Sequence, residues 1–125
     1  MHCAIKNGSN YFDLTALAQT YHTASSIIVG DDATYYVSVC NSLPNVLDYA
    51  FCPPGSGICR ITQDGAFTKF GQSLGKSEHP PFVDFMGFPT VIYTNGSTCE
   101  DKPDEPLRSR IIFYVTLMLE WESLF

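Results

Sequence analysis

The chain is short of charged residues and of long apolar runs, and each shortage disfavours a class of protein. Only 16% of the 125 residues are charged, seven of them Lys or Arg, and the net charge is −6. Nucleic-acid binding needs clustered basic side chains and is therefore disfavoured, as is attraction to anionic lipid. No uncharged apolar segment reaches the roughly 18 residues of a membrane span, and no signal peptide is present. If the protein is secretory, we expect its targeting sequence to lie outside this fragment.

Motifs of catalysis and of metal binding are also missing. His22, Ser25-Ser26 and Asp31-Asp32 have the residue types of a hydrolase triad, but they crowd into one polar stretch typical of a solvated loop. There is no G-x-S-x-G elbow and no Gly-rich nucleotide loop. The acidic segment from Glu100 to Glu105 lacks the spacing of a calcium loop, and the cysteines lack the paired C-x-x-C of a zinc site. We therefore expect no enzyme, no cofactor and no metal.

What is present indicates one folded all-β domain spanning residues 1–125. Hydrophobic residues make up 45% of the chain and aromatic residues 14%, which is enough for one core. Apolar and polar residues alternate with period two in short segments separated by Gly, Pro and Asn turns. Asp64-Gly65 predicts a hairpin, whereas the acidic, Pro-containing segment after Asn95-Gly96 predicts a longer loop. The predicted strands are 34–40, 58–62, 66–70, 82–85 and 90–94, with at most one helical turn at 14–18.

Five cysteines and two N-x-S/T sequons indicate an extracellular or lumenal protein. Cys52 and Cys59 bracket a Pro-Pro-Gly-Ser-Gly-Ile loop, so disulfides are a simpler interpretation than metal or redox chemistry. The sequons begin at Asn7 and Asn95, and both asparagines are predicted glycosylation sites.

The C-terminal apolar run is too long for one strand. Residues 111–121 contain no turn residue and would extend about 36 Å as a strand, at ~3.3 Å per residue. Two shorter strands whose connection is missing are a simpler account.

Several blocks, in order along nearly the whole chain, resemble the mannose 6-phosphate receptor homology family. They are most like the repeats of the cation-independent mannose 6-phosphate and insulin-like growth factor II receptor. The similar blocks are Asn10–Leu17, Tyr35–Cys40, Cys52–Cys59, Val91–Cys99, Arg108–Val115 and Leu119–Trp121. This resemblance implies a flattened β-barrel or two-sheet β-sandwich stapled by disulfides.

The resemblance also implies the cysteine pairing. Cys3 is expected to pair with Cys40, and Cys52 with Cys59, whereas Cys99 is left without its family partner. The family has two further cysteines and a strand between the positions of Val115 and Thr116. That piece is absent at the place where the apolar run is too long, so an omitted loop, a truncation and a variant form all remain open.

The sugar-binding pattern of the family is only partly present. Members that bind mannose 6-phosphate use a Gln, an Arg, a Glu and a Tyr, which together donate to and accept from vicinal hydroxyls. Arg60 stands at the Gln position, Arg108 fits the Arg with Arg110 as a fallback, and Leu117 replaces the Tyr. The Glu falls in the missing piece. The resemblance therefore implies a degenerate sugar site.

The resulting expectation is a non-enzymatic receptor repeat in the secretory-pathway lumen or at the cell surface, in a receptor that sorts lysosomal enzymes. Its partners would be neighbouring repeats, with glycoprotein ligands carrying mannose 6-phosphate and insulin-like growth factor II as alternatives. Phe85, Met86 and Phe88, like the stretch 47–51, either pack in the core or form an apolar protein-contact patch. Core packing is the simpler interpretation.

Overall fold

The computed structural model describes residues 3–25, 30, 32–47, 50–63, 69–98, 102 and 104–113. Among these residues the regular structure is strand, apart from one 3-10 turn, η1, at Thr15–Ala18. The strands are β1 Ala4–Asn7, β2 Asn10–Asp13, β3 His22–Ser25, β4 Thr34–Val37, β5 Val46–Leu47, β6 Ala50–Phe51, β7 Ser56–Gln63, β8 Lys69–Lys76, β9 Phe82–Val83, β10 Pro89–Tyr93 and β11 Ser109–Ile112. The all-β prediction is confirmed.

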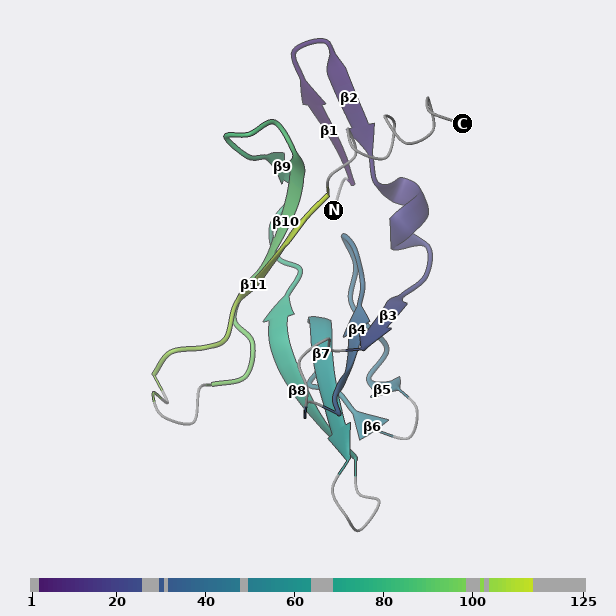
Figure 1. Ribbon diagram of the computed structural model, residues 1–125, viewed down its shortest axis with the longest axis vertical. Coiled ribbons are helices and arrows are strands. Elements are labelled where there is room, and N and C mark those ends of the chain that lie inside the picture. The colour runs from purple at the N-terminus through teal and green to yellow at the C-terminus, as the bar shows by residue number, and fades with distance from the viewer. Residues whose placement is uncertain are drawn as a thin grey trace.

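Two sheets form the body of the fold. The larger sheet has the order β3-β4-β7-β8, and the smaller has the order β11-β10-β9, with antiparallel pairing throughout (Figure 1). They are joined where β8 ends, because Lys76 and Thr94 exchange backbone hydrogen bonds of 2.6 and 3.1 Å. Among the described strands these two linked sheets do not close into a barrel, and β1–β2 and β5–β6 form separate two-stranded sheets.

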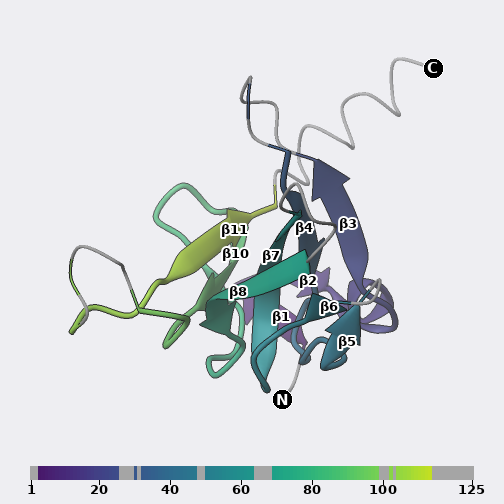
Figure 2. The ribbon, with the colours of Figure 1, turned by 90° about the horizontal axis from the view of Figure 1, so that it is seen from below.

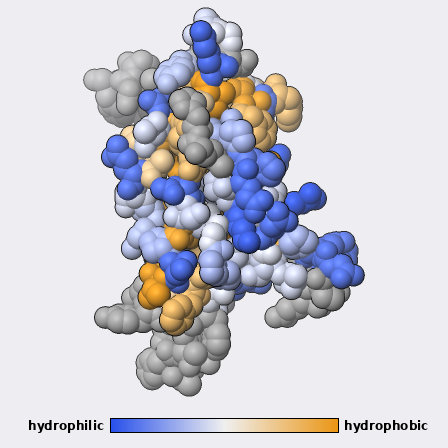
Figure 3. All heavy atoms as spheres, turned by 180° about the vertical axis from the view of Figure 1, so that it is seen from behind, coloured by the Kyte–Doolittle hydropathy of each residue, from blue (hydrophilic) through white to orange (hydrophobic). Residues whose placement is uncertain are grey.

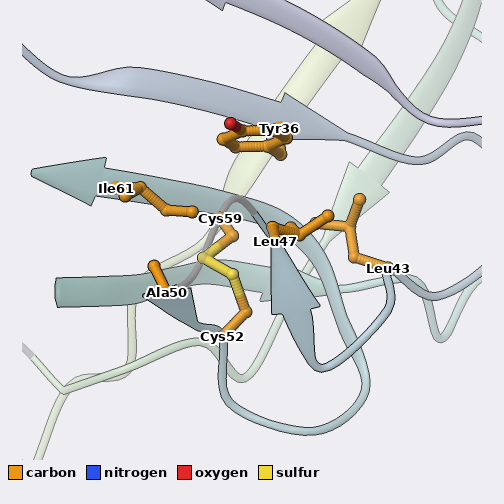
Figure 4. Packing of buried hydrophobic residues seen from close by; sticks show 7 residues of the cluster. All are labelled: Tyr36, Leu43, Leu47, Ala50, Cys52, Cys59 and Ile61. Atoms are coloured by element: carbon orange, nitrogen blue, oxygen red, sulfur yellow. A yellow bond between two sulfur atoms is a disulfide. The ribbon is translucent and has the colours of Figure 1, made fainter. Parts of the chain in front are cut away.

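Each face of the larger sheet packs against its own apolar cluster. One cluster contains Tyr36 on β4 with Cys59 and Ile61 on β7, covered by Leu47 and Ala50 of the β5–β6 hairpin (Figure 4). On the opposite face Ile58 packs with residues of the smaller sheet and of the N-terminal hairpin; that second cluster contains Cys3, Leu14, Val39, Ile58, Val91 and Tyr93. A sheet covered on both sides does not show a clean apolar–polar alternation.

The N-terminal hairpin, β1–β2, is fixed to the rest of the chain by a disulfide and a hydrogen bond. Cys3 is bonded to Cys40, which follows β4, with 5.7 Å between the two Cα atoms. The Leu14 N–H donates to the Cys3 carbonyl at 2.9 Å, and Leu14 enters the second cluster. Figure 1 shows this hairpin beyond one end of the larger sheet, so in the view from below it lies behind that sheet (Figure 2). The structure also contains the Cys52–Cys59 disulfide that the resemblance implies.

Several strand predictions hold, and some need correction. The region 58–62 is strand and 90–94 is strand up to Tyr93, and β7 pairs with β8 as the predicted hairpin, although its turn, with Asp64-Gly65, lies outside the described residues. The stretch from His22 to Ser25 was expected to be loop but forms β3, an exposed edge strand that pairs with β4. The run from Thr34 is strand only to Val37. Cys99 and residues 114–121 lie outside the described part of the chain.

Candidate functional site

Arg60, at the expected Gln position, lies in the middle of the larger sheet. The strand register places it opposite Tyr35 of β4 on one side and Gln72 of β8 on the other. Residues paired in this way point to the same face of a sheet, about 5 Å apart at Cβ. All three are partly buried, so Tyr35, Arg60 and Gln72 form a row, called here the Arg60 row.

Sequence reasoning did not identify Gln72 as a neighbour of Arg60. Gln72 lies twelve positions from Arg60 along the chain, so the spacing in the sequence alone does not bring the two residues together. The β7–β8 hairpin folds it back to the position directly opposite Arg60. The predicted hairpin indicated that the two strands pair, but which residue lies opposite Arg60 depends on the number of residues in the turn.

Arg108, the expected sugar-binding arginine, lies just before β11 and lines two open hollows. One, of about 450 Å³, is lined by Thr94, Asn95, Asp104, Glu105, Pro106 and Arg108. The other, of about 430 Å³, is lined by Ile92, Tyr93, Thr94, Arg108, Ser109 and Arg110. The fallback Arg110 therefore shares the second hollow with Arg108.

The structure does not gather all the expected sugar-site residues in one hollow. Arg60 is not among the residues that line either of the two hollows at Arg108. Leu117 lies outside the described residues. The structure instead has two separate polar regions. One is the partly buried Arg60 row on the larger sheet, and the other is the exposed Arg108, which lines a hollow with Asp104 and Glu105.

The loop between β9 and β10 presents large apolar side chains to solvent. Phe85 is 96% exposed and Met86 is 64% exposed, so the interpretation that they pack in the core is wrong, whereas Phe88 is half-buried. The Asp84 carboxylate accepts hydrogen bonds of 2.9 Å from the N–H groups of both Met86 and Phe88. Gly87 has a φ of 88°, in the left-handed region that glycine tolerates. The turn is therefore held by its own hydrogen bonds while its tip faces outward.

The β5–β6 hairpin divides the other apolar stretch between core and surface. Leu47 and Ala50 are buried, as core packing predicts, whereas Phe51 is 74% exposed. The view from behind shows apolar side chains gathered toward both ends of the molecule (Figure 3).

One buried tyrosine links the larger sheet to the smaller sheet. Tyr93 of β10 is fully buried, and its hydroxyl donates a hydrogen bond of 2.9 Å to the Ser38 carbonyl, just beyond β4. Burial raises the pKa of the Tyr93 phenol above its usual value near 10, because the charged form loses its hydration. This residue is structural rather than reactive.

Within the described residues, no group of three or more His, Cys, Asp and Glu side chains is placed to hold a metal ion. The His22 Nε2 lies 3.0 Å from the Leu17 carbonyl oxygen, and the His79 Nε2 lies 3.3 Å from the Thr94 hydroxyl. Of the residues in the triad pattern, Ser26 and Asp31 lie outside the described part. In the same part, no helix has the length and hydropathy to cross a membrane.

These features define a disulfide-bonded, all-β domain. The sequence model of the family described as the cation-independent mannose-6-phosphate receptor repeat matches residues 1–100, so this chain belongs to that family. Homologues in it are receptor repeats, which are not enzymes.

Two relatives place the chain more closely. The human cation-independent mannose-6-phosphate receptor is 25% identical over 88 residues, which is 66% of this chain and 3% of that protein. The solution structure of domain 11 of the echidna receptor for mannose 6-phosphate and insulin-like growth factor II superimposes with a TM-score of 0.63 at 23% identity, covering 90% of this chain and 70% of that one. The second likeness shows the shared fold. The chain therefore corresponds in length to a small fraction of the human receptor.

Proposed function

We propose that this chain is a non-enzymatic ectodomain repeat of a lysosomal-enzyme sorting receptor, with a degenerate sugar site, that serves as scaffold or protein-binding module. Its place would be the lumenal or extracellular side of the Golgi, endosomes or cell surface. The observation that carries the proposal is the position of Arg60 in the centre of the sheet, between Tyr35 and Gln72, where the resemblance leads us to expect a Gln.

The chemistry of the side chain explains why this substitution matters. A Gln amide donates through its nitrogen and accepts through its oxygen, whereas an arginine guanidinium only donates. A sugar hydroxyl bound at this position therefore loses its acceptor. Each lost hydrogen bond costs about 0.5–1.5 kcal/mol, and the Leu117 replacement expected from the resemblance removes another.

The competing function is a working lectin, and Gln72 is the observation that favours it. Its amide stands opposite Arg60 and could supply the acceptor that Arg60 lacks. The exposed Arg108 could meet a phosphate or a hydroxyl at the sheet edge.

Affinity chromatography on immobilised mannose 6-phosphate separates the two functions. We expect the full chain to pass through the column. Retention that free mannose 6-phosphate reverses, and that glucose 6-phosphate does not, would overturn the proposal. If the chain is retained, loss of retention in Gln72→Ala would identify the Arg60 row as the site.

A protein-binding role is favoured by the exposed tip of the β9–β10 turn. Surface plasmon resonance with insulin-like growth factor II tests one partner that the family resemblance implies. If the tip contacts the partner, Phe85→Ser weakens binding by tenfold or more, because exposed aromatic anchors dominate such interfaces. Phe51→Ser is the matched control, since Phe51 is exposed on the β5–β6 hairpin. Equal loss in both variants would contradict a specific role for the turn.

A further inference from the structure

The sequon Asn95-Gly96-Ser97 is clamped between two segments of the folded chain. The Ser97 N–H donates to the Ser73 carbonyl at 2.9 Å, and the Ser97 hydroxyl accepts from the Ser73 N–H at 3.0 Å. On the other side the Gly96 N–H donates to the Leu107 carbonyl at 2.9 Å, and the Leu107 N–H donates to the Ser97 carbonyl at 2.8 Å. The middle of the sequon is thus part of the strand-like packing at the edge of β8.

Gly96 leaves no room for the segment to shift. A Cβ atom added there would lie 2.6 Å from the Ser73 carbonyl oxygen and 2.9 Å from the Leu107 carbonyl oxygen. Both neighbours are backbone atoms, so neither can swing away as a flexible side chain would. The clamp is therefore closed in the folded state.

Asn95 itself points the other way. Its side chain is exposed, its φ of 56° marks a left-handed turn position, and its Nδ2 donates to the Glu78 carboxylate at 3.1 Å. Asparagine is among the few residues that adopt this backbone conformation readily. A glycan on Nδ2 would leave one N–H on the nitrogen and would project into solvent.

We propose that Asn95 carries an N-linked glycan whose attachment is completed before the clamp around Ser97 closes. The oligosaccharide transferase that attaches such glycans recognises the serine hydroxyl as well as the asparagine amide, because both belong to the sequon. In the folded chain only the asparagine is exposed, since Ser97 is half-buried and its hydroxyl is bonded to Ser73. The extended, unfolded chain offers both.

The transfer step involves a lipid-linked oligosaccharide diphosphate as donor. The Asn95 Nδ2 forms a bond to the anomeric carbon of the first sugar, and the bond from that carbon to the diphosphate oxygen breaks. One amide proton passes to a base of the transferase, and the lipid diphosphate leaves. Once attached, the glycan stands at the rim of the hollow that Asn95 shares with Arg108.

The site is tested by secretory expression of the full chain in the Ser9→Ala background, which removes the other sequon. Intact mass before and after peptide-N-glycosidase treatment should show one glycan, and Asn95→Asp and Ser97→Ala should each abolish it. Asp tolerates the left-handed backbone at position 95, and either variant alone suffices if the other fails to fold. Absence of any glycan in the Ser9→Ala protein would overturn the proposal.

The order of events is tested with unglycosylated protein incubated with microsomal transferase and donor. We expect the reduced, unfolded chain to be modified at least tenfold faster at position 95 than the folded chain with both disulfides. Equal rates, or modification of the folded chain alone, would overturn the proposal.

Discussion

The hydroxyl of Tyr93 donates a hydrogen bond of 2.9 Å to the carbonyl oxygen of Ser38, across 55 positions of sequence. Tyr93 belongs to the smaller sheet, and Ser38 follows β4 of the larger one. Gly57 allows this contact, because a Cβ atom there would lie 2.5 Å from the tyrosine ring. The buried ring and its hydrogen bond thus join the larger sheet, which contains Arg60, to the smaller sheet, whose strand β11 begins just after Arg108.

Removing that hydroxyl should destabilise the domain. In Tyr93→Phe the ring still fills its place, but the buried Ser38 carbonyl loses its donor, so we expect the free energy of unfolding to fall by about 1–2 kcal/mol. Guanidinium denaturation measures the change. Tyr11→Phe, at a side chain that is 63% exposed, is the control and should change it by less than about 0.5 kcal/mol. An unchanged Tyr93→Phe midpoint would show that the bond contributes nothing.

The same tyrosine should make the domain sensitive to alkali. Below about pH 10 the phenol is protonated in both states. Above that pH the unfolded phenol ionises, while the buried one keeps its proton because its pKa is raised. The native state then binds more protons, so the free energy of unfolding falls by up to about 1.4 kcal/mol per pH unit from this group.

Comparison with Tyr93→Phe isolates this contribution. The difference in unfolding free energy between wild type and variant, measured by brief denaturant titrations at pH 9–11, should shrink as pH rises. A constant difference would mean that Tyr93 does not titrate differently in the two states.

Gly71 should tolerate no side chain. A Cβ atom there would lie 2.1 Å from the Phe51 carbonyl oxygen, so Gly71→Ala must push the β5–β6 hairpin away from β8. We expect a loss of about 1–3 kcal/mol, by analogy with overpacked cores. Urea denaturation measures it, with Gln72→Ala at the next strand position as control. Equal stability of the two variants would contradict the close packing of the hairpin on β8.

The Cys3–Cys40 disulfide should stabilise the fold more than the Cys52–Cys59 disulfide does. It closes a loop with a sequence separation of 37, against 7 for Cys52–Cys59. In the chain-entropy account these loops correspond to about 4 and about 2.4 kcal/mol. The paired variant Cys3→Ala/Cys40→Ala should therefore lose about 4 kcal/mol in calorimetry. A loss below about 1 kcal/mol would show that β1–β2 docks without the bond.

Sequence reasoning identified the strands that contain β-branched core residues. The stretch around Ile58 and the one around Val91 are β-branched, lie in the core and were predicted as strands. The stretch from His22 to Ser25 was missed because all four residues are exposed and become strand only by pairing with β4. Propensity carries no signal for such an edge.

The site was predictable only in part, for reasons of packing. The family pattern named Arg60 and Arg108, but the position of Gln72 depends on the register across the hairpin. Core packing was the simpler of two interpretations of Phe85 because apolar residues usually lie in the core, and nothing in the sequence showed that the turn held by the Asp84 carboxylate would present it to solvent. The full set of disulfide pairs came from the resemblance, since five cysteines alone allow several pairings.

The central claim, that the Arg60 row no longer binds mannose 6-phosphate, is tested most directly by titrating the sugar into the 15N-labelled full chain and following amide shifts by NMR. The account predicts no saturable shifts at Tyr35, Arg60 or Gln72 at millimolar sugar. Saturable shifts that converge on those three residues, absent with glucose 6-phosphate, would contradict it.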